Sequence, residues 1–209
     1  MEASPSYAGS TVTGMATAKR GLKHGLSRRS RTVFLMLDET IITETPPLYN
    51  AYGKKGLRIE VPISGNRAKR VLHGVLNIRS GETHFLIAGE WNQQTHQALL
   101  RMIRRHWRGW HVVIFLDKGS PHTADESQLL AKEIGLELRF LPTATPELNA
   151  MDHLWRFVKG QALANRRTQS IDRSANQAAQ YLLNMSAHER LKKAGTLSTK
   201  FWLKNLIVK

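Results

Sequence analysis

The sequence predicts an α/β fold in which a mixed central β-sheet is flanked by α-helices. Residues 32–37 and 112–116 are continuous apolar runs, and each is followed by an acid, Asp38 or Asp117. Such runs are typical of strands buried on both faces. Alternating apolar and polar segments lie between the two runs, and helix and strand patterns follow the second run. This order of elements fits a mixed sheet best.

The first half of the chain is expected to form strands and then one helix. Residues 57–63 alternate like a half-buried strand at a sheet edge. Residues 71–78 and 83–87 flank a short polar segment and predict a β-hairpin. Residues 92–107 predict a helix that Asn92 caps. Its buried side is expected to carry Leu99, Leu100, Ile103 and Trp107.

The second half is expected to be mainly helical. Residues 122–134 predict a helix, residues 136–141 a strand, and a further helix begins at Asn149. The buried face of that helix is expected to carry Met151, Leu154, Trp155, Val158 and Ala162. Residues 170–194 predict one more amphipathic helix, in which the candidates for burial are Leu182, Leu183 and Met185. The apolar residues of the C-terminal tail are expected to dock on the body of the protein or on a partner.

The chain divides into three parts by composition and pattern. Residues 1–31 are rich in small, polar and basic residues and are expected to be a disordered basic arm or a linker remnant. Residues 32–165 are expected to form the main domain. Residues 166–209 are expected to form a C-terminal helical extension.

The composition is strongly basic, since 31 Lys and Arg against 16 Asp and Glu give a formal net charge of +15. Such an excess predicts binding to nucleic acid through its phosphates, although a solvated basic surface or a ribosome-associated protein would have a similar composition. The chain has no cysteine, which excludes disulfides and Cys-ligated zinc. No apolar run approaches the roughly 18 residues of a membrane span, so we expect a soluble, intracellular protein and no membrane partner.

Three carboxylates are candidates for one site. Ligands gather outside the carboxyl ends of parallel strands, so Asp38 and Asp117 are expected at the same sheet edge if their strands are neighbours. Asp152 lies in the first turn of a helix that follows a proline-bounded loop. Converging carboxylates repel one another, and a divalent cation relieves that repulsion. Oxygen ligands select Mg²⁺ or Mn²⁺, and two such ions can support phosphodiester cleavage or strand joining.

Each of these acids also has a purely structural explanation. Asp117 could form a turn, Asp38 could cap a strand end, and Asp152 could complete a capping box. We do not expect Glu39 to bind metal, because consecutive residues of a strand point to opposite faces. Glu147 is not expected to bind metal either.

Basic residues outside these positions are candidate DNA contacts. Four arginines fall mostly away from the buried side of helix 92–107, where they could bind DNA or form a solvated face. Two lysines lie near the candidate acids. The candidate DNA-binding residues are Arg101, Arg104, Arg105, Arg108, Lys118 and Lys159.

Residues 116–123 and 141–155, together with Val158 and Lys159, resemble the catalytic domain of the IS630/Tc1/mariner transposase superfamily. The likeness extends over roughly residues 33–165. It includes the spacing of the second and third acids of that family, because 34 residues lie between Asp117 and Asp152.

The resemblance implies an RNase H-like fold, with two Mg²⁺ (or Mn²⁺) ions held by Asp38, Asp117 and Asp152. It implies that His122 takes part near the site, although His122 could equally be a helix-start residue that bonds to the backbone. The implied activity is nicking of transposon ends and transfer of the freed 3′-hydroxyl into target DNA, usually at TA dinucleotides. The implied partners are double-stranded DNA and either a second copy of the chain or a separate helix-turn-helix protein. The implied location is the prokaryotic cytoplasm, in association with the nucleoid.

The sequence departs from the family pattern at three points. Lys118 stands where the family commonly has Asn, and Asp152 stands where insertion-sequence members more often have Glu, although the mariner branch uses Asp. The family's N-terminal helix-turn-helix region is not evident before the first catalytic strand, so we expect a catalytic fragment, one of two reading frames or a decayed copy. Two alternatives therefore stay open: a stand-alone RNase H-like DNA nuclease, and a degenerate, non-catalytic DNA-binding remnant.

Overall fold

The structure is a computed structural model of the chain. It describes residues 16–17, 19–23, 31–50, 52, 54–56, 60–61, 65, 67–166 and 169–207. The strand expected at residues 57–63 falls mainly on positions outside the described residues. None of the helices in the described part of the chain is long and apolar enough to cross a membrane.

A five-stranded mixed sheet forms the centre of the fold, as the sequence predicts. Its strands are β1 (Thr32–Thr43), β2 (Lys69–Asn77), β3 (Thr83–Ala88), β4 (His111–Leu116) and β5 (Leu136–Phe140). They are arranged in the order β3-β2-β1-β4-β5. β1 pairs antiparallel with β2 and β2 antiparallel with β3, whereas β1, β4 and β5 run parallel to one another.

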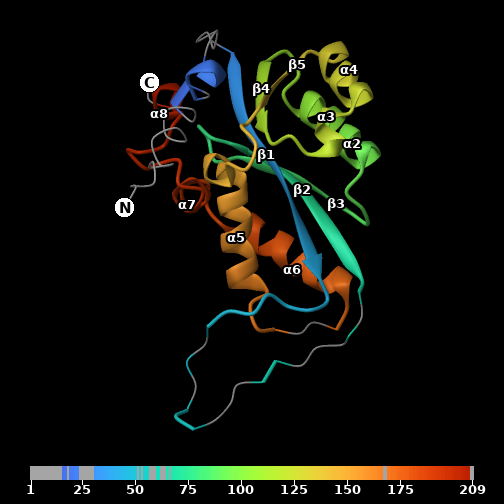
Figure 1. Ribbon diagram of the computed structural model, residues 1–209, viewed down its shortest axis with the longest axis vertical. Coiled ribbons are helices and arrows are strands. Elements are labelled where there is room, and N and C mark those ends of the chain that lie inside the picture. The colour runs from blue at the N-terminus through green and yellow to red at the C-terminus, as the bar shows by residue number, and fades with distance from the viewer. Residues whose placement is uncertain are drawn as a thin grey trace, which may run out of the picture.

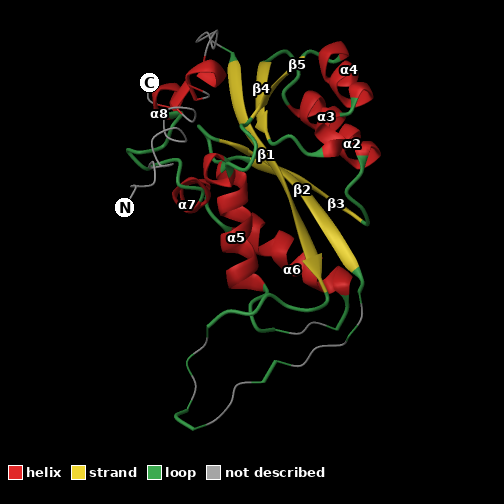
Figure 2. Ribbon diagram, in the orientation of Figure 1, coloured by secondary structure: helices red, strands yellow, loops and turns green. Residues whose placement is uncertain are grey.

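Helices cover both faces of this sheet (Figures 1 and 2). One face carries α2 (Gln93–His106), α3 (Ser120–Thr123) and α4 (Asp125–Glu133). The other face carries α5 (Ala150–Ala162) and α6 (Ile171–Asn184), which lie along the long strands β1 and β2. The structure also contains η1 (Pro146–Leu148), α7 (Ala187–Lys193) and α8 (Lys204–Ile207).

Alternation along β1 divides its side chains between the two layers. Phe34 and Met36 belong to the core that includes α5 and α6, whereas Leu35 and Leu37 belong to the core that includes α2. All four side chains are fully buried. The central strand is therefore apolar on both faces, which explains the continuous apolar run in the sequence.

β1 is longer than the apolar run predicts. The run predicts a strand that ends at Asp38, but β1 continues to Thr43 because β2 pairs with it that far. The parallel neighbour β4 pairs with β1 only up to Met36 and Phe115. Asp38 therefore lies within β1, two positions beyond its last pair with β4.

Two expected helices are each divided in two. The helix expected at residues 122–134 is α3 and α4, because Ala124 has extended backbone angles (φ −57°, ψ 132°). The helix expected at residues 170–194 is α6 and α7, since the chain is extended at Met185 and Ser186 begins a new capping box. Leu182 and Met185 are buried as expected, but Leu183 is 48% exposed.

Both ends of the described chain pack on the body of the protein. In the C-terminal tail, Trp202 and Leu203 are buried, and Trp202 Nε1 donates a hydrogen bond to the Leu148 carbonyl at 2.9 Å. Of the two expected docking places, the body and a partner, these residues therefore occupy the body. Within the segment expected to be a disordered arm, residues 19–23 are helical and Leu22 packs partly against the core.

Candidate active site

Asp38, Asp117 and Asp152 line one pocket of about 400 Å³. Lys118 lines it as well, and the loop at residues 141–146 forms much of its remaining wall. The structure thus brings together the three carboxylates that the sequence analysis singles out, although they lie far apart in the chain.

The strands bring the first two carboxylates to the same place. β1 and β4 are parallel neighbours, so both run towards the same edge. Asp117 is the first residue after β4, and Asp38 lies on β1 just past the point where β4 has ended. Its position there results from the pairing of β1 with β2 rather than from the end of a strand.

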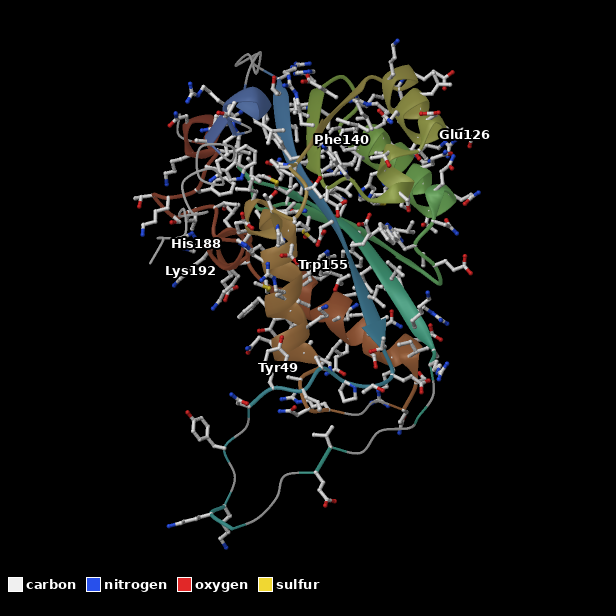
Figure 3. All side chains as sticks on the ribbon, in the orientation of Figure 1. Tyr49, Glu126, Phe140, Trp155, His188 and Lys192 are labelled. Carbon is white, nitrogen blue, oxygen red and sulfur yellow. The ribbon has the colours of Figure 1, made fainter. Side chains whose placement is uncertain are left out.

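The first turn of α5 supplies the third carboxylate, and two hydrogen bonds fix this helix to β1. The Asn149 Nδ2 donates to the Leu37 carbonyl at 2.9 Å, while the Asn149 Oδ1 caps the first turn of α5. Trp155, labelled in Figure 3, donates from Nε1 to the Asp38 carbonyl at 3.3 Å. Asp152 lies between Asn149 and Trp155 in the chain, so these two contacts hold it beside Asp38.

Close packing of α5 on the sheet requires a glycine in β2. Gly74 pairs with Asp38 across β1 and β2. A Cβ atom at this position would lie 2.6 Å from Trp155 Cζ2 and 2.7 Å from Met151 Cε. Because a side chain at residue 74 would displace α5, the glycine is part of what brings the carboxylates together.

The Asp38 carboxyl lies in an unfavourable environment for a negative charge. Burial raises its pKa well above the usual value, and the neighbouring carboxylates Glu39, Asp152 and Asp117 raise it further. A cation bound among these carboxylates would relieve the repulsion.

Asp117 meets a different partner on the other side of β1. His122 is fully buried, and its Nδ1 lies 2.7 Å from Asp117 Oδ1 while its Nε2 lies 2.6 Å from Glu39 Oε1. Burial opposes a charged imidazole, but the hydrogen bonds to Asp117 and Glu39 outweigh it and raise the pKa of His122 to about 10. The hydrogen bond from His122 lowers the pKa of Asp117. His122 is therefore a buried cation, and its hydrogen bond orients the carboxylate of Asp117.

Glu39 has its own histidine neighbours. Burial raises its pKa, but the hydrogen bond with His122 and the nearby ring of His73 outweigh this and lower the pKa of Glu39 to about 2. His73 lies opposite Glu39 on β2, with its Nδ1 3.6 Å from Glu39 Oε1. Glu39 does not line the carboxylate pocket, although it lines a smaller cavity together with Asp38 and Asp117.

Two buried histidines of this region are absent from the sequence prediction. They are His73 on β2 and His96 on α2, whose ring centroid lies 4.5 Å from that of His122. Burial, followed by the charge of His122, lowers the pKa of His96 to about 3, so this ring is neutral. The sequence signal was a histidine at a position where the strand or helix pattern calls for an apolar residue.

The resemblance implies that His122 takes part near the site, and the structure places it next to Asp117. Its ring lies behind Asp117 and does not line the carboxylate pocket. Both ring nitrogens already bind carboxylates, so His122 can act on the pocket only through Asp117.

The candidate DNA-binding residues occupy different places. Lys118 is exposed and lines the carboxylate pocket, whereas Lys159 lines a separate cavity beside residues 41–47. Arg104 donates to the backbone carbonyls of Trp107, Trp110 and Gly135, so it closes the end of α2. The exposed arginines of the group are Arg101, Arg105 and Arg108.

The donor set of the pocket suits Mg²⁺ or Mn²⁺. Asp38, Asp117 and Asp152 offer hard carboxylate oxygens, and such oxygens are what these ions prefer. Asp117 is 56% exposed and Asp152 is 25% exposed at the side chain, so both can be reached from solvent. Asp152 also pairs with Arg156 one turn further along α5.

Comparisons with known proteins agree with this geometry. The family model described as "DDE superfamily endonuclease" matches residues 33–174. No curated protein matches the sequence.

Solved structures of the Mos1 transposase share the fold. The Mos1 catalytic domain is 18% identical with a TM-score of 0.60, and the match covers 98% of this chain and 95% of that one. The Mos1 catalytic domain with raltegravir and Mn is 16% identical with a TM-score of 0.65, covering 96% and 95%. The Mos1 paired-end complex with the left transposon end is 18% identical with a TM-score of 0.69, and here the chain spans 63% of the Mos1 length. These matches confirm the RNase H-like fold of a transposase catalytic domain.

Proposed function

Because the chain belongs to the DDE superfamily endonuclease family, we propose that it cleaves DNA at transposon ends and transfers the freed 3′-hydroxyl into target DNA. The observation that carries this proposal is the single pocket lined by Asp38, Asp117 and Asp152. These acids come from two parallel strands and a helix, and α5 is anchored so that they face one another. The family and the geometry together favour phosphodiester chemistry.

Asp38, Asp117 and Asp152 would hold two Mg²⁺ or Mn²⁺ ions. When bound, such ions activate an attacking water or 3′-hydroxyl and stabilise the leaving oxygen. Support for this assignment comes from the oxygen donors of the pocket and from Mos1 paired-end complexes solved with Mn and with Mg.

The other residues of the site would position these carboxylates and the DNA. His122 holds one oxygen of Asp117, which limits the rotation of that carboxylate. Lys118, in place of the Asn that the family commonly carries, would contact a phosphate at the rim of the pocket. Asn149 and Trp155 hold the first turn of α5 against β1.

Double-stranded DNA is the proposed partner, both as transposon ends and as target at TA dinucleotides. The net charge of +15 supports this, and three of the similar Mos1 structures are paired-end complexes. The exposed Arg101, Arg105 and Arg108 would bind phosphates, and Lys159 is a further candidate. We propose that the chain belongs to the IS630 branch and acts in the prokaryotic nucleoid, with a second copy of the chain or a helix-turn-helix protein as a further partner. Residues 32–165 would be the catalytic domain and residues 166–209 its extension.

The test is a strand-transfer assay with pre-nicked transposon-end DNA. The natural chain is compared with Asp117→Asn in Mg²⁺ and in Mn²⁺. We expect Asp117→Asn to lose about 100- to 1000-fold or more of the activity, as removal of one electrostatic group at a reacting centre does. Asp125→Asn is the matched control, because Asp125 is an exposed acid at the start of α4.

Other outcomes separate the alternatives. Metal-dependent nicking without transfer would favour a stand-alone nuclease. DNA binding without any metal-dependent product would favour a non-catalytic remnant and would contradict the proposal.

A further inference from the structure

A second group of metal-ligating side chains lies away from the carboxylate pocket. It consists of Glu82, His84 and His106, whose ligand atoms all lie within 4.8 Å of one another. Glu82 precedes β3, His84 is on β3, and His106 ends α2. None of the three lines the pocket of Asp38, Asp117 and Asp152.

Each of the two histidines directs its Nε2 atom towards the same oxygen of Glu82. His84 Nε2 lies 3.2 Å and His106 Nε2 lies 2.7 Å from Glu82 Oε1. In a tetrahedral zinc site with bonds of about 2.0–2.2 Å, neighbouring ligand atoms are about 3.3 Å apart. Both nitrogen-to-oxygen separations are therefore close to those of a zinc site, and all three ligand atoms lie within 4.8 Å of one another.

The backbone around these ligands is well held. The Asn77 N–H donates to the Glu82 carbonyl at 2.8 Å, which closes the β2–β3 hairpin, and the Glu82 N–H donates to Ser80 Oγ at 3.2 Å. The rings of both histidines make edge contacts with Trp107, with centroids 5.2 Å and 4.7 Å away. Such support lowers the cost of ordering the ligands.

Charge also favours a cation here. The carboxylate of Glu82 is one ligand, and His106 stands in the last turn of α2, where the helix dipole is negative. Two imidazoles and one carboxylate select zinc and similar transition metals rather than magnesium.

We propose that Glu82, His84 and His106 form a binding site for a transition metal ion such as Zn²⁺, distinct from the carboxylate pocket. The side chains are 41%, 26% and 40% exposed, so water or a partner's side chain would complete the coordination. The ion would join the edge strand β3 to the end of α2. The site does not depend on the proposed transposase activity.

The experiment is a calorimetric titration of the full chain with Zn²⁺ in excess Mg²⁺, so that Mg²⁺ competes for the carboxylate pocket. We expect the natural chain to bind one more Zn²⁺ than the double variant H84Q/H106Q, or to bind it at least 100-fold more tightly. Co²⁺ should give the visible absorption of a low-coordinate site in the natural chain and not in the double variant.

His111 supplies the matched control. It forms a comparable pair with Glu137, with Nε2 2.9 Å from Oε2 and side chains 29% and 33% exposed. His111→Gln should bind Zn²⁺ like the natural chain. If H84Q/H106Q does not fold, as judged by thermal unfolding without metal, Glu82→Gln takes its place. Equal stoichiometry and affinity in the natural chain and in the variant that lacks these ligands would overturn the proposal.

Discussion

Asp38 and Glu39 are neighbours in β1, yet the two faces of the strand surround them differently. Glu39 faces α3, where His122 Nε2 lies 2.6 Å from its carboxylate and His73 stands opposite on β2. Asp38 faces α5, and its partner on β2 is Gly74, which has no side chain. The face of Glu39 thus contains the charged partner His122, whereas the β2 residue paired with Asp38 has no side chain that could offset its charge.

The consequence appears in the opposite pKa shifts of the two acids. The pKa of Glu39 is lowered to about 2 because its histidine neighbours, above all the hydrogen-bonded His122, outweigh its burial. The pKa of Asp38 is raised, because burial and neighbouring carboxylates act in the same direction. We infer that His122 balances the negative charge of Glu39, whereas the negative charge of Asp38 is balanced only when a cation binds from solution.

The largest expected effect is on stability at the neutralised face. Glu39→Gln removes one partner of a buried ion pair and leaves the charge of His122 uncompensated on that side. We expect the free energy of unfolding to fall by about 3–5 kcal/mol in urea denaturation with chelator present. Glu137→Gln is the control, because Glu137 pairs with His111 at a partly exposed edge, and it should cost about 1 kcal/mol or less. Equal losses in the two variants would argue against a special role for the buried pair.

The pair of His122 and Glu39 also predicts that the free energy of unfolding depends on pH. Since folding raises the pKa of His122 from 6.5 to about 10, its contribution is complete below pH 6.5 and is lost as pH rises towards 10. Metal-free protein should lose up to about 1.4 kcal/mol per pH unit across that window. Urea unfolding at several pH values checks this. His122→Gln should have a flatter profile, and a slope as steep as that of the natural chain would contradict the assignment.

A smaller loss of stability is expected from a substitution at Gly74, on the side of the sheet where α5 packs. Gly74→Ala places a Cβ 2.6 Å from Trp155 and should displace α5 from β1. We expect a loss of about 1–3 kcal/mol in the free energy of unfolding, together with reduced DNA cleavage because Asp152 moves with the helix. Gly89→Ala is the control, since a Cβ there meets nothing within 4 Å. Thermal unfolding and cleavage assays should separate the two variants.

Much of the fold could be predicted from pattern alone. The apolar runs, the hairpin and the stripe of α5 each report a local period, and burial follows directly from it. The break at Ala124 could not be predicted in this way, because alanine is compatible with a helix. The break at Met185 is not visible in the hydrophobic period either, but the capping box of Ser186 and Glu189 that follows it is a local sequence signal.

The candidate site was only partly predictable. Asp38, Asp117 and Asp152 stood out as acids after apolar runs or in a first helical turn. Glu39 lies outside the carboxylate pocket, in keeping with the alternation of a strand, but its pairing with His122 depends on contacts between segments 83 residues apart. His73 and His96 gave no signal beyond an unexpected polar residue in an apolar pattern.

The most direct test of the account is the stability of Asp38→Asn without and with Mg²⁺. In chelator the variant should be more stable than the natural chain, by about 0.5–2 kcal/mol, because it removes a repelled carboxylate. Mg²⁺ at 100 times its dissociation constant should stabilise the natural chain by about 2.7 kcal/mol and the variant by less. A variant that is less stable in chelator and gains as much from Mg²⁺ as the natural chain would show that Asp38 is an ordinary structural acid, and would contradict the account.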